Sequence, residues 1–206
     1  MEPLRIHSGI VAPLDRADVD TDQIIPKQFL KRIERTGYGE FLFYDWRWTP
    51  DGKPRPEFAL NRSPYDRASI LVAGRNFGCG SSREHAAWAL RDFGFRVIIA
   101  PAFANIFSTN CAKNGLALIT LEDAQIAELM RNAQQRAPYR LTVNLESRTI
   151  TDYRSLSITF EMEDFRRHCL MEGLDDIGLT LQHESDIARY ERSRNSWLPA
   201  TTSPGG

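Results

Sequence analysis

Residues 69–85 read SILVAGRNFGCGSSREH, and this order of residue types predicts a strand, a turn and a helix. The apolar run at 69–73 has the length and composition of a buried strand. The glycines that follow it, at 74, 78 and 80, predict a tight turn, because glycine adopts backbone angles closed to other residues. We expect a helix to open at residues 81–85 and to run to about Asp92.

The sequence after this stretch repeats the alternation of strands and helices. Two more apolar runs of strand length lie at 96–100 and 116–121. Helices are predicted at 103–113, between these runs, and at 122–135, after them. This spacing indicates an α/β core with at least three parallel or mixed strands.

The two ends of the chain complete the expected fold. A strand is predicted at 6–14, and alternating polar and apolar residues between 140 and 162 predict antiparallel strands with one exposed face. Helices are expected at 163–172 and 179–194. The segment 44–69, rich in Pro, Asp, Asn and aromatic residues, is expected to be a long ordered surface loop. The predicted fold class is therefore α/β, with a mixed sheet and flanking helices.

Composition limits the class of protein. The 206 residues are 42% hydrophobic and 26% charged, the ordinary balance of one globular domain. We expect a single domain over 1–195 and a flexible tail at 196–206. The net charge of -1 argues against a nucleic-acid partner. No apolar run approaches the roughly 20 residues of a membrane span, and the N-terminus has no signal-peptide core, so a cytoplasmic location is expected.

The cysteines give no sign of a metal site on this chain. Cys79, Cys111 and Cys169 are odd in number, lie far apart and form no C-x-x-C pair. This spacing argues against a disulfide framework, a zinc site or an iron–sulfur site built by this chain alone.

The turn and helix start at 74–85 predict an anion site. Unsatisfied N–H groups and the helix dipole attract an anion to a helix N-terminus, and Ser81, Ser82 and Arg83 add two hydroxyls and a guanidinium there. Nucleotide phosphate is the poorer match, because no lysine follows the glycines and their spacing is not G-x-G-x-x-G. A carboxylate substrate is favoured.

The same residues have a purely structural interpretation. Ser81-x-x-Glu84 matches the capping-box pattern, in which both side chains only stabilise the helix start. His85, one turn into the helix, is expected to pack rather than to act as a base. If Ser81 does chemistry, a proton-transfer role is favoured over acyl transfer, because no nucleophile-elbow motif surrounds it.

Two motifs carry a resemblance to a known family: VDTDQIIP at 19–26 and GCGSSREHA at 78–86. Together they resemble the swivel domain of the aconitase superfamily and, more closely, the family of 3-isopropylmalate dehydratase small subunits. The likeness extends over nearly the whole chain. It includes FLFYDWR at 41–47, FRRHC at 165–169 and GLDDIGLTLQH at 173–183.

The resemblance implies a swivelling β/β/α domain and a hydro-lyase active only with a large subunit, as a heterodimer. The reaction implied is the isomerisation of 2-isopropylmalate and 3-isopropylmalate, through 2-isopropylmaleate, in leucine biosynthesis. The substrate would be a small hydroxy-dicarboxylate. A [4Fe-4S] cluster would be bound by the partner large subunit, with none on this chain.

Site residues are implied by the same resemblance. Ser81 matches the serine that acts as an alkoxide base, and Ser82 and Arg83 match residues that hold substrate carboxylate. Thr21 and Asp22 match a loop that faces the catalytic cleft, and Arg32 and Arg35 lie in the loop expected to set substrate specificity. All four are expected to bind substrate. The remaining residue of note, Cys79, stands where aconitase has Glu and is expected to be a small packed residue.

Two alternatives stay open at this point. The chain could be the small subunit of a related dehydratase acting on 2-methylmalate or dimethylmalate. It could instead belong to another class, a stand-alone carboxylate-binding module in which Ser81 and Glu84 only cap a helix.

Overall fold

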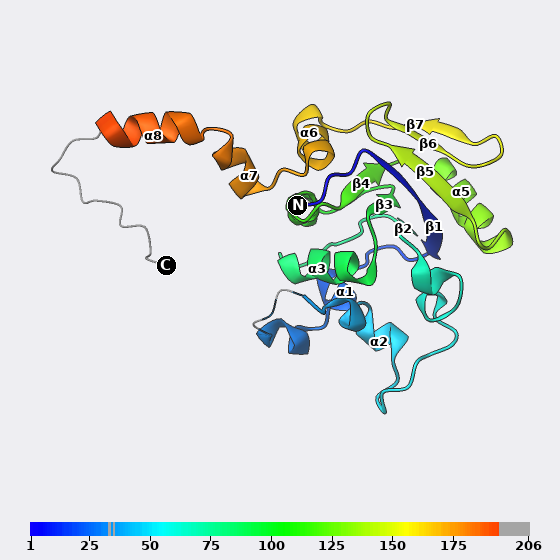
Figure 1. The fold of residues 1–206 in the computed structure, drawn as a ribbon. Helices are drawn as coiled ribbons and strands as arrows, with labels where there is room; N and C mark the ends of the chain where they lie inside the picture. The colour runs from blue at the N-terminus through cyan, green and yellow to red at the C-terminus, as the bar shows by residue number, and fades with distance from the viewer. Residues whose placement is uncertain (33, 35, 194–206) are drawn as a thin grey trace.

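A seven-stranded mixed sheet forms the centre of the protein (Figure 1). The computed structural model describes residues 1–32, 34 and 36–193, and its sheet has the strand order β4-β3-β2-β1-β5-β6-β7. Four strands are parallel: β1 (Ile6–Leu14), β2 (Ile70–Ala73), β3 (Val97–Ala100) and β4 (Ala117–Thr120). Three antiparallel strands extend the sheet beyond β1: β5 (Arg140–Asn144), β6 (Thr149–Thr151) and β7 (Ser157–Thr159). The predicted α/β class with a mixed sheet is confirmed.

The side-chain pattern of each strand follows from what covers it. Every residue of β2 and β3 is buried, as expected for parallel strands with both faces covered. In β5, Leu141 and Val143 are buried whereas Arg140 is exposed, which is the alternation of an antiparallel strand with one solvated face.

Helices cover both faces of the parallel strands. On one face, α3 (Glu84–Phe93) and α4 (Asn105–Lys113) share a buried apolar cluster with Leu71 and Ile98. On the other face, α5 (Asp123–Gln135) packs against Ile70, Val72 and their neighbours. The sheet therefore lies between two apolar layers, which confirms the expected flanking helices.

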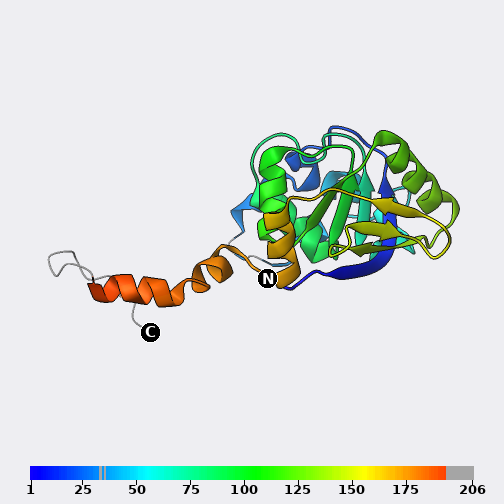
Figure 2. The same ribbon diagram turned by 90° about the horizontal axis from the view of Figure 1, so that it is seen from above.

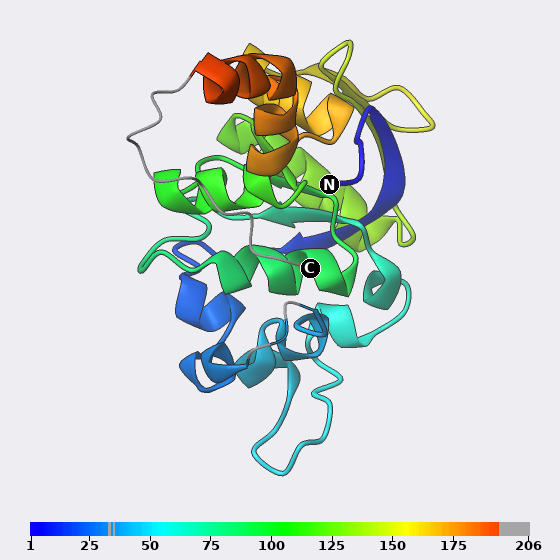
Figure 3. The ribbon, with the colours of Figure 1, turned by 60° about the vertical axis from the view of Figure 1, so that its left-hand side comes forward.

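The segment 44–69 is ordered, as predicted, but it contains short helical pieces. It begins with α2 (Tyr44–Arg47), and Asn61 ties it together by donating hydrogen bonds to the carbonyl oxygens of Arg47 (2.7 Å) and Arg55 (3.0 Å). The rings of Phe43, Trp46 and Phe58 pack together beneath it. Figure 3 shows this part of the chain, in cyan, gathered with the blue segment that precedes it. The short elements of the two segments are α1 (Thr21–Ile24), η1 (Lys27–Lys31), η2 (Gly39–Phe41), η3 (Ala59–Asn61) and η4 (Tyr65–Arg67).

The C-terminal helices differ from the prediction. After α6 (Asp164–Glu172), the single helix expected at 179–194 is replaced by α7 (Asp176–Leu181) and α8 (Glu184–Ser193). The first of these begins early because the Asp175 carboxylate caps it, accepting a 2.8 Å hydrogen bond from the backbone N–H of Gly178. Both helices extend away from the sheet as an arm (Figures 1 and 2).

The predicted domain boundary is not tested by the structure. Residues 196–206, the expected tail, lie outside the described residues, so the boundary at residue 195 stays a prediction. None of the helices in the described part of the chain has the length and apolar character needed to cross a membrane.

Candidate functional site

Two loops meet at the carboxyl edge of the parallel strands. The chain leaving β1 and the chain leaving β2 are neighbours there because the two strands pair in parallel. Backbone hydrogen bonds join the loops: Asp18 N–H donates to the Arg75 carbonyl (2.9 Å), Gly78 N–H to Val19 (2.7 Å) and Thr21 N–H to Cys79 (2.9 Å). The pairing places Thr21 and Asp22 beside the glycine-rich turn, although about sixty residues separate them along the chain.

Two glycines give the turn its shape. Gly78 and Gly80 have φ of +78° and +86°, in the left-handed region that side chains disfavour. Gly78 also lies against the buried Phe107 ring, whose Cγ would be 2.2 Å from a Cβ added at residue 78. Only glycine therefore permits both the turn and its packing against α4.

Gly78→Ala is expected to lower the free energy of unfolding by about 3 kcal/mol, since left-handed strain and overpacking each cost of order 1–3 kcal/mol. Gly52→Ala is the matched control, because Gly52 has φ +77° and nothing within 4 Å of an added Cβ. It should cost about 1 kcal/mol from backbone strain alone. Urea unfolding of both variants measures the difference, and equal losses would contradict the packing argument.

The helix after the turn opens within the predicted residues 81–85, but Ser81 is not its cap. Its first residue is Glu84 and its N-cap is Arg83. The capping box between Ser81 and Glu84 is absent, and the Glu84 carboxylate instead accepts a hydrogen bond from Asn114 Nδ2 (3.2 Å). The cause is tertiary: the turn at Gly80 and the 2.8 Å hydrogen bond from Thr21 Oγ1 to the Ser81 carbonyl hold residue 81 outside the helix.

This arrangement leaves both serine hydroxyls accessible. Ser81 and Ser82 are exposed, and neither side-chain oxygen makes a hydrogen bond within the described residues. The purely structural interpretation of Ser81 as a helix cap thus loses its geometric basis. Both hydroxyls are available to a ligand.

Arg83 is held by a carboxylate. Its guanidinium forms an ion pair with Asp22, and its side chain is only 10% exposed. The hydrogen bond from Arg83 is the main cause of a lowered Asp22 pKa; partial burial of Asp22 opposes it, and the Arg83 charge adds to it. Asp22 therefore stays ionised and orients a guanidinium that has further N–H donors for an anion.

Some of the site residues predicted from the sequence line a common depression. Its wall consists of Thr21, Gly78, Gly80, Ser81, Ser82, Arg83 and the start of α4 at 104–107. Asp22 adjoins it through Arg83. Arg32 lies elsewhere, paired with Glu34 (3.5 Å) and Glu40 (3.3 Å), and Arg35 lies outside the described residues.

The first turn of α4 is a part of the site that the sequence analysis missed. Phe77 N–H donates to the Ala102 carbonyl (3.1 Å), and Ala104 N–H donates to the Phe77 carbonyl (3.2 Å). These bonds bring Asn105 and Ile106 to the depression. The predicted strand at 96–100 could have indicated this part of the site, because the loops that follow neighbouring parallel strands meet at one edge of the sheet.

The described residues offer no ligand set for a metal cluster. They contain no group of three or more His, Cys, Asp or Glu side chains placed as metal ligands. Burial raises the pKa of Cys111 well above its usual value and is also the main cause of the raised pKa of Cys79 and of Cys169. The three thiols are thus protonated in the free chain. Cys79 is half-buried, as expected of a small packed residue.

His85 packs against aromatic rings, as predicted. Its ring centroid lies 5.4 Å from that of Tyr38 and 4.6 Å from that of Trp88. Burial is the main cause of its lowered pKa; the Glu84 charge opposes this shift and the Arg83 charge adds to it. The neutral imidazole therefore serves as a packed ring.

The lowered pKa predicts acid sensitivity that His85→Phe should reduce. The unfolded chain binds the His85 proton more tightly, so its contribution to stability is complete above about pH 6.5 and is lost as the pH falls towards the folded pKa. His7, whose pKa is also lowered mainly by burial, retains part of the effect. Urea unfolding between pH 7.5 and 5 gives the slope of the unfolding free energy against pH for the wild type and for His85→Phe. Equal slopes would show that His85 does not cause the acid sensitivity.

Fold and site together define a class of protein. A mixed sheet whose adjacent parallel strands carry a Thr-Asp loop and a glycine-serine-arginine loop is the arrangement of an aconitase-type swivel domain. The family model for the aconitase C-terminal domain matches residues 1–124. A model described as LeuD_N matches residues 127–164, and the model for the C-terminal domain of 3-isopropylmalate dehydratase small subunits matches residues 176–202.

Individual relatives narrow the class. The chain is 56% identical to the 3-isopropylmalate dehydratase small subunit of Brevibacillus brevis, over 94% of this chain and 100% of the relative. It is 58% identical to the small subunit of Koribacter versatilis, over 94% and 99%. The solved structure of a 3-isopropylmalate dehydratase (leuD) from Methanocaldococcus jannaschii shares the fold, with a TM-score of 0.66 and 24% identity over 89% of this chain and 98% of that one. The chain belongs to the family of 3-isopropylmalate dehydratase small subunits.

Proposed function

We propose that this chain, together with a large subunit, forms a hydro-lyase that isomerises 2-isopropylmalate and 3-isopropylmalate through 2-isopropylmaleate. Family membership at 54–58% identity supports the activity. The observation that carries it in the structure is the gathering of Thr21, Ser81, Ser82 and Arg83 at one depression. The two serine hydroxyls and the guanidinium suit a carboxylate substrate. Because the unpaired cysteines suit a reducing compartment, we place the enzyme in the cytoplasm.

The proposal divides the active site between two chains. The residues described here do not form a ligand set for a [4Fe-4S] cluster, so we assign the cluster to the large subunit. When bound, the cluster would act as a Lewis acid towards the substrate hydroxyl and carboxylate. The small subunit would contribute the base and the carboxylate-binding groups.

Ser81 is proposed to remove the proton from the substrate carbon. A serine hydroxyl is a weak acid, so its alkoxide form needs electrostatic stabilisation from fixed donors and positive charge. Arg83, two residues along the chain, lines the same depression and supplies that charge. Gly78 and Gly80, both at positive φ, shape the turn that brings Ser81 to this depression.

Ser82 and Arg83 are proposed to hold a substrate carboxylate. The ion pair with Asp22 occupies part of the guanidinium, and a substrate carboxylate would take its remaining N–H donors. Thr21 is proposed to act on the backbone rather than on substrate. Its hydroxyl donates to the Ser81 carbonyl (2.8 Å) and so fixes the position of the catalytic serine.

Co-expression with the large subunit tests the proposal. A complex that dehydrates 2-isopropylmalate and rehydrates the product to 3-isopropylmalate is expected. A complex that instead prefers 2-methylmalate or dimethylmalate would assign the chain to a related dehydratase. Carboxylate binding by this chain alone, with no complex formed, would support the stand-alone module.

A further inference from the structure

The arm formed by α7 and α8 carries an exposed apolar stripe. Ile177 and Leu181 are four residues apart on α7 and are 71% and 60% exposed. Ile187 and Tyr190 are three residues apart on α8 and are 40% and 66% exposed. Residues three or four apart share one face of a helix, so each helix presents a paired apolar surface to solvent. Large exposed apolar patches of this kind mark interaction sites.

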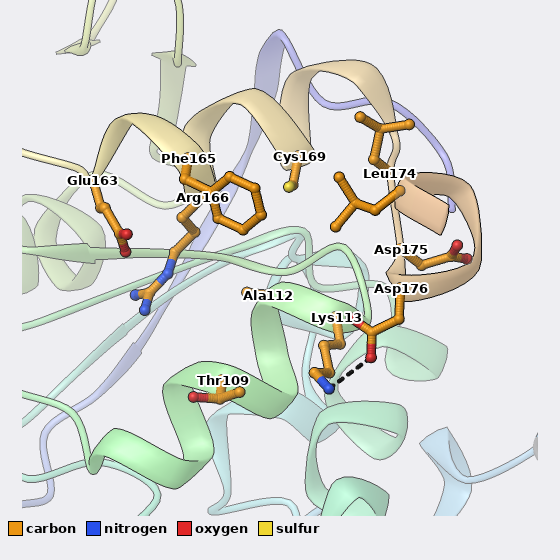
Figure 4. Close-up of a pocket in the computed structure, with 11 residues that line it drawn as sticks. Thr109, Ala112, Lys113, Glu163, Phe165, Arg166, Cys169, Leu174, Asp175 and Asp176 are labelled. Atoms are coloured by element: carbon orange, nitrogen blue, oxygen red, sulfur yellow. Dashed lines mark hydrogen bonds and ion pairs between the residues drawn. The ribbon is translucent and has the colours of Figure 1, made fainter. Parts of the chain in front are cut away.

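A groove lies at the base of the arm, between α4 and the α6–α7 segment (Figure 4). It holds a cavity of about 170 Å³ whose apolar wall includes Phe165, Leu174 and Leu179. A 2.7 Å ion pair between Lys113 of α4 and Asp176 of α7 ties its two sides together. The groove is large enough to receive a side chain from another molecule.

An unpaired cation lines this groove. Arg166 is half-buried, and its guanidinium forms no ion pair or hydrogen bond within the described residues. Partial burial of a charge without a partner costs free energy, and arginine beside apolar surface is enriched where proteins bind one another. The groove is thus suited to a partner that brings an acidic side chain.

Helix α4 connects the groove to the catalytic depression. Its first turn, with Asn105 and Ile106, lines the depression, and its last turn, with Ala112 and Lys113, lines the groove. Nine residues at 1.5 Å each make the helix about 13 Å long, so the two hollows lie one short helix apart. Ile106 is itself 56% exposed. A protein that covers Ser81 to complete the active site would reach the groove by following α4.

We propose that the large subunit follows this path and grips the α7–α8 arm as a second contact, with an acidic side chain on Arg166 and an apolar patch against Ile187 and Tyr190. This inference rests on the proposed function, which requires a partner over Ser81. The arm lies within residues 176–202, the segment matched by the C-terminal family model of the small subunits, so it is a feature of the family that shares this partner.

Titration of purified large subunit into this chain, with isopropylmalate turnover as the readout, tests the second contact. Tyr190→Asp is expected to raise the amount of large subunit needed for half-maximal rate at least tenfold, as for loss of an interface hot spot. The plateau rate should stay at the wild-type value, because Tyr190 lies outside the catalytic depression. Tyr153→Asp is the matched control: Tyr153 is also 66% exposed, but it lies between β6 and β7, at the far edge of the sheet from β4.

The outcomes separate this inference from the proposed function. If the wild-type chain forms no complex with the large subunit, the proposed function fails and the inference fails with it. If the wild type binds and Tyr190→Asp binds equally well, only the arm contact is overturned. Sedimentation of the isolated chain tests whether a second copy of this chain covers the arm instead. A dimer that Tyr190→Asp dissociates, with unchanged affinity for the large subunit, would assign the arm to that second copy.

Discussion

Ser81→Ala is expected to lower kcat of the assembled enzyme by about 10³-fold, because a positioned general base contributes roughly 10²–10⁴ to a rate. The variant removes the proposed base and nothing else of structural weight. The Ser81 side chain is exposed and makes no hydrogen bond within the described residues. Folding and affinity for the large subunit should therefore match the wild type.

Steady-state kinetics with the large subunit in saturating amount measure this effect. Ser82→Ala is the control, since Ser82 is an equally exposed neighbour that is proposed to bind carboxylate rather than to move a proton. It should act mainly on KM. A Ser81→Ala enzyme with kcat within tenfold of the wild type would show that another group removes the proton.

Arg83→Lys is expected to lower kcat/KM about 100-fold. Lysine keeps the positive charge but loses the planar fork that can bind Asp22 and a substrate carboxylate together. A hydrogen bond to a charged group contributes about 1.5–3 kcal/mol, which corresponds to roughly ten- to 100-fold. The side chain is nearly buried, so water replaces the lost donors poorly.

Arg75→Lys is the matched control for this prediction. Arg75 belongs to the same loop and also pairs with a carboxylate, that of Asp123, but it is 60% exposed and does not line the depression. Its replacement should leave kcat/KM unchanged. Equal effects of the two variants, measured with the large subunit in saturating amount, would mean that Arg83 acts only through general charge.

Asp22→Asn tests how much the orientation of the Arg83 guanidinium by Asp22 contributes, apart from the binding of substrate by Arg83 itself. The guanidinium remains, so the loss in kcat/KM should be smaller than for Arg83→Lys. The double variant should lose no more than Arg83→Lys alone, because the two residues act as a unit.

Local sequence patterns were enough to predict the strands of the sheet, but not the start of the helix after Ser81 or the break in the arm. Apolar runs such as 69–73 predicted strands correctly because burial on both faces leaves a direct trace in composition. The capping-box pattern at Ser81 failed because Thr21 binds the Ser81 carbonyl and Asn114 binds the Glu84 carboxylate, two long-range contacts that no local rule contains. The arm was predicted as one helix because the break between Leu181 and Glu184 has no proline or glycine to mark it.

The sequence by itself determined the α/β class, the family resemblance and the set of residues on the glycine-rich turn. Only the tertiary structure decided which of them lie together. Parallel pairing of β1 and β2 brings Thr21 and Asp22 to Ser81 and Arg83, and parallel pairing of β3 adds the first turn of α4. The groove and the exposed stripe of the arm also depend on tertiary placement. Contacts between residues distant in the chain arise from how strands pair and helices pack, and this information is absent from any single segment.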